Sequence, residues 1–89
     1  MSYLEDIIRL CQSYRQHVFD IAEFQSRLQT ARLPDKISKR YFITLHNLCN
    51  DLEEVIYFYP KSEHQTRATA IADQIIEASL IEQTHLSRY

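Results

Sequence analysis

Glycine is absent from this sequence of 89 residues. Phosphate-binding loops, dinucleotide-binding turns, nucleophile elbows and the tight turns of β-hairpins all rely on glycine, because its backbone reaches positive φ angles and approaches ligands closely. None of these motifs can occur here in its usual form. Since only two prolines interrupt the chain further, we expect one helix to follow another.

Cysteines and long apolar runs are also scarce. Cys11 and Cys49 each fall on the apolar side of an expected helix, where a reduced thiol acts as a small hydrophobic group. The opening MSYLEDII carries acidic residues early and has no basic segment before an apolar one, so it is not typical of a secretory signal. No run approaches the roughly 20 apolar residues of a membrane span. We therefore expect a cytoplasmic protein with no membrane association.

The overall composition is that of a small globular domain. Hydrophobic residues make up 45% and charged residues 25% of the chain, and a chain of this length fits one domain. The net charge of −2 provides no long-range attraction for nucleic acid. We expect a single helical domain over residues 1–89, in which residues 84–89 fray.

Apolar residues recur at spacings of three and four, which predicts an all-α fold, a compact bundle of four helices. The expected helices span residues 3–17, 21–31, 35–59 and 63–83. Capping boxes mark the start of the first, second and fourth helices: Ser2–Glu5, Asp20–Glu23 and Ser62–Gln65. Phe19 and Phe24 stand where a hydrophobic staple would place them. The short link at Pro60 predicts that the last two helices form a long antiparallel hairpin.

The third expected helix has the most regular apolar stripe. The stripe consists of Ile37, Tyr41, Leu45, Leu48, Leu52, Val55 and Tyr59, and is widened by Phe42, Cys49 and Ile56. Such a pattern over more than about twenty residues indicates one long amphipathic helix. In the fourth helix small residues, among them Ala68, Ala72 and Ala78, are expected to face inward and allow close packing.

The side opposite this stripe is the candidate partner-binding site. It combines apolar and aromatic groups with acids and an amide, as interfaces do. Its residues are Ile43, Asn50, Asp51, Glu53, Glu54, Tyr57 and Phe58. The alternative is a helix buried on all sides, in which Ile43 and Phe58 belong to the core.

Candidate catalytic and metal-binding groups are sparse. His46 and Cys49 are three residues apart on one helix and Cys11 could join them, but a structural zinc site normally has four protein ligands. We favour a buried thiol beside a boundary histidine, and expect no enzyme activity and no cofactor. The remaining histidines, His17, His64 and His85, are scattered.

Two other surface groups have competing interpretations. Basic residues gather in the segment 27–40: Arg27, Arg32, Lys36, Lys39 and Arg40. With Tyr41 and Phe42 they could bind nucleic acid in a small regulatory adaptor, although a solvated loop fits the net charge better. Leu80 and Ile81 point away from the inward stripe and indicate either a homodimer seam or a fraying helix end.

The segments LEDIIRL (4–10) and DIAEFQSRLQTARLPDKIS (20–38) resemble small helical immunity proteins of bacterial polymorphic-toxin and contact-dependent growth inhibition systems. The shared features are an opening amphipathic helix, a D-I-x-E-F-x-S-R-L helix start and a Pro-Asp hinge before a long Glu-rich helix. The similarity covers about the first half of the chain and thins out after Leu52. Ala22 and Gln29 stand where acidic residues are expected.

The resemblance implies a cytoplasmic protein that binds a cognate toxin domain and blocks it in a stoichiometric complex. Such toxins are often nucleases with a basic substrate groove. An acidic helix face that carries aromatic residues would suit this partner, because complementary potentials speed encounter and fix orientation.

Overall fold

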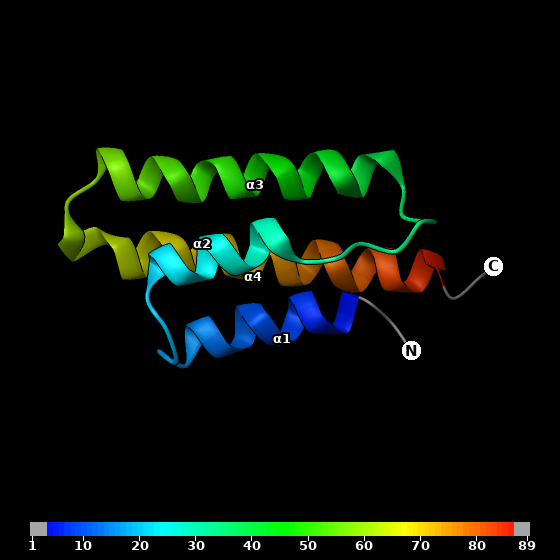
Figure 1. The fold of residues 1–89 in the computed structure, drawn as a ribbon, viewed down its shortest axis with the longest axis horizontal. Helices are drawn as coiled ribbons and strands as arrows, with labels where there is room; N and C mark the ends of the chain where they lie inside the picture. The colour runs from blue at the N-terminus through cyan, green and yellow to red at the C-terminus, as the bar shows by residue number, and fades with distance from the viewer. Residues whose placement is uncertain (1–3, 87–89) are drawn as a thin grey trace.

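Four α-helices make up most of residues 4–86, the part of the chain that the computed structural model describes. They are α1 (Leu4–Arg15), α2 (Ile21–Thr30), α3 (Lys39–Phe58) and α4 (Lys61–Leu86). In Figure 1, α3 and α4 run antiparallel beside each other, while α1 lies along the other side of α4. The predicted all-α bundle and its antiparallel hairpin are therefore confirmed.

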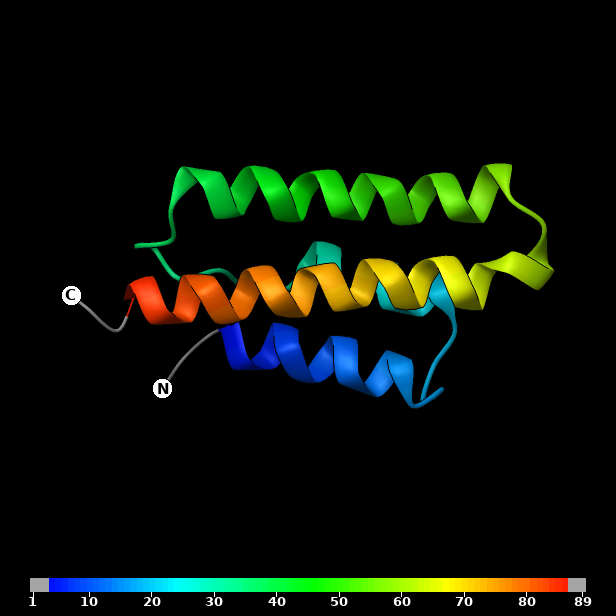
Figure 2. The ribbon, with the colours of Figure 1, turned by 180° about the vertical axis from the view of Figure 1, so that it is seen from behind.

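The helices form a bundle in which α2 and α4 occupy opposite sides. Each of these two helices packs against both α1 and α3. Figures 1 and 2 show the molecule from its two broad sides, with α2 in front of α4 in the first view and behind it in the second. The molecule measures 43 × 23 × 19 Å along its principal axes. The longest helix, α4, thus contacts every other helix.

One hydrophobic cluster joins all four helices and follows the predicted stripes. Its fully buried members include Leu4, Ile7 and Cys11 of α1, Phe24 of α2, Leu52 of α3, and Ala68, Ala72 and Ile75 of α4. Phe24 stacks on Tyr14 with ring centroids 4.5 Å apart, and Phe19 lies 6.2 Å from Phe24 as the staple predicts. Burial of each leucine, isoleucine or phenylalanine side chain in this cluster stabilises the fold by about 1.5–3 kcal/mol.

α1 ends at Arg15, before the predicted residue 17, because the chain reverses there without a glycine. His17 adopts a φ of 63°, in the left-handed region. Its amide donates to the Tyr14 carbonyl at 2.9 Å and the Val18 amide donates to the Ser13 carbonyl at 3.1 Å. These two bonds define a Schellman motif, whose left-handed position is usually glycine.

α2 starts at the predicted cap, but its capping box is only half formed. The Asp20 carboxylate accepts a hydrogen bond of 2.9 Å from the Glu23 amide. The Glu23 carboxylate pairs with Arg27 at 3.2 Å. The reciprocal bond expected from Glu23 to the Asp20 amide is therefore replaced by an ion pair one turn along the helix.

The predicted start of α3 at residue 35 is wrong. The helix begins at Lys39, because the Ser38 hydroxyl caps it by accepting a hydrogen bond of 3.1 Å from the Tyr41 amide. Residues 34–37 form a turn in which the Ile37 amide donates to the Pro34 carbonyl at 3.3 Å.

The predicted bounds of α4, 63–83, are also too short. The helix starts at Lys61, directly after Pro60. The expected Ser62–Gln65 capping box is not formed, because the side-chain amide of Gln65 donates a hydrogen bond of 3.1 Å to the Thr69 hydroxyl. At the other end Leu86 continues the helix and packs, partly buried, against the core. Ser2 of the first capping box and residues 87–89 of the expected frayed tail lie outside the described residues. Within residues 4–86, no helix combines the length and apolar character that crossing a bilayer requires.

Candidate functional site

The outer face of α3, defined by Ile43, Asn50, Asp51, Glu53, Glu54, Tyr57 and Phe58, lies on the surface of the bundle. Ile43 is 48% exposed, Tyr57 72% and Phe58 80%. The buried residues of α3, by contrast, face α2 and α4. The alternative that α3 is covered on all sides, with Ile43 and Phe58 in the core, is therefore wrong.

Five of these seven residues gather near the carboxyl end of α3. Asn50, Glu53, Glu54, Tyr57 and Phe58 line a hollow of about 390 Å³. Ile43 lies two turns before Asn50 on the same face, since positions seven residues apart are nearly aligned on a helix. Asp51 is exposed but does not line the hollow. Five of the seven candidate residues thus surround one hollow, and Ile43 and Asp51 do not line it.

The hollow combines negative charge with exposed aromatic rings. Among residues 4–86 the ion pairs are Arg15–Asp73, Arg27–Glu23 and Arg67–Glu63, so Asp51, Glu53 and Glu54 have no internal counterion. The last turn of α3 contains no basic residue, and helix carboxyl ends themselves carry partial negative charge. A cation would be favoured here by the acids, by the helix end and by the faces of Tyr57 and Phe58.

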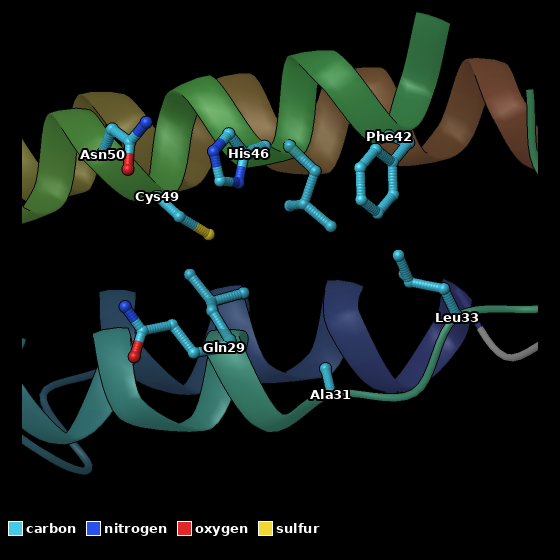
Figure 3. A pocket seen from close by; sticks show the side chains of 9 residues that line it. Gln29, Ala31, Leu33, Phe42, His46, Cys49 and Asn50 are labelled. Atoms are coloured by element: carbon cyan, nitrogen blue, oxygen red, sulfur yellow. The ribbon is translucent and has the colours of Figure 1, made fainter. Parts of the chain in front are cut away.

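A second hollow, between α2 and α3, was not predicted. It has a volume of about 260 Å³ and shares Asn50 with the hollow of the outer face. Figure 3 shows Phe42 and Cys49 pointing into it from α3, with Ala31 and Leu33 on the opposite wall. Its lining is mostly apolar, and Gln29, His46 and Asn50 supply polar groups at its edge.

Two residues of the predicted apolar stripe, Phe42 and Tyr59, are exposed, and Phe42 lines the α2–α3 hollow. We expected Phe42 to widen the buried stripe, but it is more than half exposed and stacks on His46 with centroids 6.5 Å apart. The reason is that α2 ends at Thr30 and leaves this side of α3 to the loop at residues 31–38. The apolar residues at the start of that loop, Ala31 and Leu33, line the hollow and were the available signal for its second wall.

The thiols next to this region are poorly suited to chemistry at neutral pH. Burial raises the pKa of Cys11 to about 12, and burial also raises the pKa of Cys49. Thiolates, not thiols, bind metals and attack substrates. In the described part of the chain, no three or more His, Cys, Asp or Glu side chains are placed to hold a metal ion.

Near the basic segment 27–40, Arg27 and Tyr41 already have partners within the chain. Arg27 is paired with Glu23, and its guanidinium carbon lies 4.9 Å from the centroid of the Phe19 ring. Tyr41 is buried, where its hydroxyl bonds Ser79 at 2.7 Å. A stacking platform for bases at Tyr41 and Phe42 is therefore not formed, because one ring is buried and the other lines the α2–α3 hollow.

These features define the class of the molecule as an all-α four-helix bundle with an acidic, aromatic surface at one end of α3. In comparisons with known proteins, no protein-family model, curated protein or solved structure matches the chain. The candidate function therefore rests on the residues of the surface.

Proposed function

We propose that this protein is a cytoplasmic inhibitor that neutralises a basic toxin domain, such as a nuclease, by forming a stoichiometric complex through the outer face of α3. The observation that carries the proposal is the hollow in which Glu53 and Glu54 stand beside exposed Tyr57 and Phe58. Interfaces concentrate binding energy in aromatic residues, and acids next to them suit a basic partner.

The charge pattern supports a basic partner over a neutral one. Three acids of the outer face have no ion-pair partner within residues 4–86, and the surrounding helix end adds to their field. Lys and Arg side chains of the toxin would be attracted to the face from a distance and then pack their cationic ends against the rings. The same basic residues would otherwise hold the phosphates of a nucleic-acid substrate.

The α2–α3 hollow gives the complex a place for an apolar anchor. It adjoins the outer face at Asn50, so one partner surface could contact both. Anchor residues in well-packed pockets dominate many interfaces. A toxin side chain inserted beside Phe42 would add apolar contact to the electrostatic attraction at Glu53 and Glu54.

The test requires a candidate toxin domain, sought first in the reading frame immediately upstream and purified with its catalytic residues replaced. Isothermal titration should show one-to-one binding to the wild-type chain. Tyr57→Ala should weaken binding by about 1–3 kcal/mol, the range of an interface hot spot. Ile43→Ala/Tyr57→Ala should weaken it further, whereas Val18→Ala/Leu80→Ala, which truncates exposed apolar residues elsewhere, should not.

Charge reversal separates electrostatic attraction from general damage. Glu53→Lys/Glu54→Lys should slow association and reduce its dependence on salt, because both effects come from unlike charges. Glu5→Lys/Asp6→Lys makes the same change in net charge at exposed positions of α1 and serves as the control. Wild-type affinity of a folded Ile43→Ala/Tyr57→Ala variant would exclude the outer face as the binding site.

A further inference from the structure

A groove between α3 and α4 carries the most exposed aliphatic side chain of α4. Ile81 is 66% exposed and borders two hollows of about 290 and 370 Å³. Both hollows are also lined by Thr44 and Ala78. Residues of α3 and α4 alone line them, and Figure 2 shows this pair of helices from the side opposite α2.

Opposite charges flank Ile81 along the groove. Arg40 lines the hollow that also contains Glu82, toward the carboxyl end of α4. Glu77 lines the other hollow, one turn toward the amino end. Both side chains are exposed, and neither forms an ion pair with another residue of the described part of the chain.

We propose that this groove is a self-association surface through which two copies of the chain form a two-fold dimer. A two-fold axis through the groove near Ile81 reverses the direction of α4. The Arg40 end of one copy then faces the Glu77 end of the other, and the symmetry makes this contact twice. Each Ile81 lies over the partner's groove, whose small floor residues Thr44 and Ala78 leave room for it.

Charge complementarity favours a second copy over a different macromolecule. A partner with one predominant charge would meet either Arg40 or Glu77 with like charge, which is costly at an interface. Because Thr44, Asn47 and Gln74 make the groove partly polar, we expect dissociation constants of about 1–100 µM.

The dimer goes beyond the proposed inhibitor function and does not depend on it. The groove residues Arg40, Glu77 and Ile81 are distinct from the outer face of α3, and a toxin could occupy each copy separately. Loss of dimerisation without loss of toxin binding, or the reverse, would therefore distinguish the two proposals.

Sedimentation equilibrium of the full chain between about 1 and 500 µM tests the dimer, since this range brackets the expected constants. We expect a monomer–dimer equilibrium for the wild type and a monomer for Ile81→Asp. Val18→Asp is a matched control, because Val18 is also an apolar residue that is 66% exposed but lies outside the groove. Circular dichroism should show that all variants keep their helical content.

A charge swap tests the orientation. Arg40→Glu and Glu77→Arg alone should each raise the dissociation constant at least about tenfold, because each places like charges together twice. The double variant Arg40→Glu/Glu77→Arg should restore dimerisation to near the wild-type constant. A wild type that stays monomeric at every concentration, a dimer that tolerates Ile81→Asp, or a double variant without recovery would each overturn the proposal.

Discussion

The Glu82 carboxylate binds Ser38 through both of its oxygens. It accepts a hydrogen bond of 2.6 Å from the Ser38 amide and another of 2.8 Å from the Ser38 hydroxyl. The same hydroxyl oxygen accepts from the Tyr41 amide and so caps α3. The end of α4 and the start of α3 are thus held by one buried carboxylate, across 44 positions of the sequence.

Replacing Glu82 should therefore weaken the whole bundle. Glu82→Gln keeps the size of the side chain but replaces one carboxylate oxygen with an NH₂ group. That group would face a hydrogen-bond donor of Ser38, so one of the two hydrogen bonds would be lost. We expect a loss of about 1–2 kcal/mol in the free energy of unfolding, since hydrogen bonds to a charged group are among the stronger ones. Urea unfolding followed by circular dichroism measures this loss. Glu77→Gln, at an exposed position of the same helix, should change it by less than about 0.5 kcal/mol.

Tyr41 and Ser79 form a second buried polar contact that can be dissected by a double-mutant cycle. Their hydroxyls lie 2.7 Å apart. Tyr41→Phe should cost about 1 kcal/mol because it leaves Ser79 without that partner, and Ser79→Ala should cost a similar amount. The double variant should lose less than the sum of the two single losses. Strict additivity in urea unfolding would show that the two hydroxyls are not coupled.

The chain reversal after α1 offers a stabilising substitution. His17 has a φ of 63°, which a residue with a Cβ atom adopts at some cost and glycine adopts freely. His17→Gly should raise the free energy of unfolding by about 0.5–1 kcal/mol. Arg9→Gly, at an exposed position inside α1, should lower it by about 1 kcal/mol. The same sign for both changes in thermal unfolding would contradict this explanation.

Alkaline pH should destabilise the fold through Cys11. Burial, with smaller contributions from Cys49 and Asp73, raises its pKa from 9.0 to about 12. The unfolded thiol ionises from pH 9 upward while the folded thiol stays protonated. The contribution of Cys11 is thus complete below pH 9 and falls between pH 9 and 12, by at most about 1.4 kcal/mol per pH unit.

Ionisation of Tyr41 should cause a second loss of stability at higher pH. Burial is the main cause that raises its pKa from 10.0 to about 12, so its contribution to the free energy of unfolding is lost above pH 10. Urea unfolding at pH 8, 9, 9.5 and 10 should show the loss from Cys11 first. Cys11→Ala should reduce the slope between pH 9 and 10; an unchanged slope would assign the pH dependence to other groups.

The arrangement of the helices could be predicted because apolar spacing reports directly on which side of a helix is buried. Leu45, Leu48 and Leu52 occupy the core face of α3 as their spacing indicates. The start of α3 could not be predicted in the same way. Asp35 and Ser38 are both suitable caps, and the choice of Ser38 depends on Glu82, which is distant in the sequence.

The sequence did not predict the shape of the candidate site. The spacing of Ile43, Asn50 and Tyr57 placed them on one side of α3, but whether another helix covers that side is a property of the assembled bundle. The α2–α3 hollow was missed because it depends on where α2 ends and on the path of the following loop. Neither leaves a periodic signal in the sequence.

The position of α4 has a consequence for how the chain is made. α1 packs against α4, and residues 16–60 lie between the two helices; a ribosome adds this segment over several seconds at about 5–20 residues per second. During that interval Leu4 and Ile7 of α1 lack the helix that packs against them. Ribosomes stalled before α4 is synthesised should therefore carry protease-sensitive nascent chains.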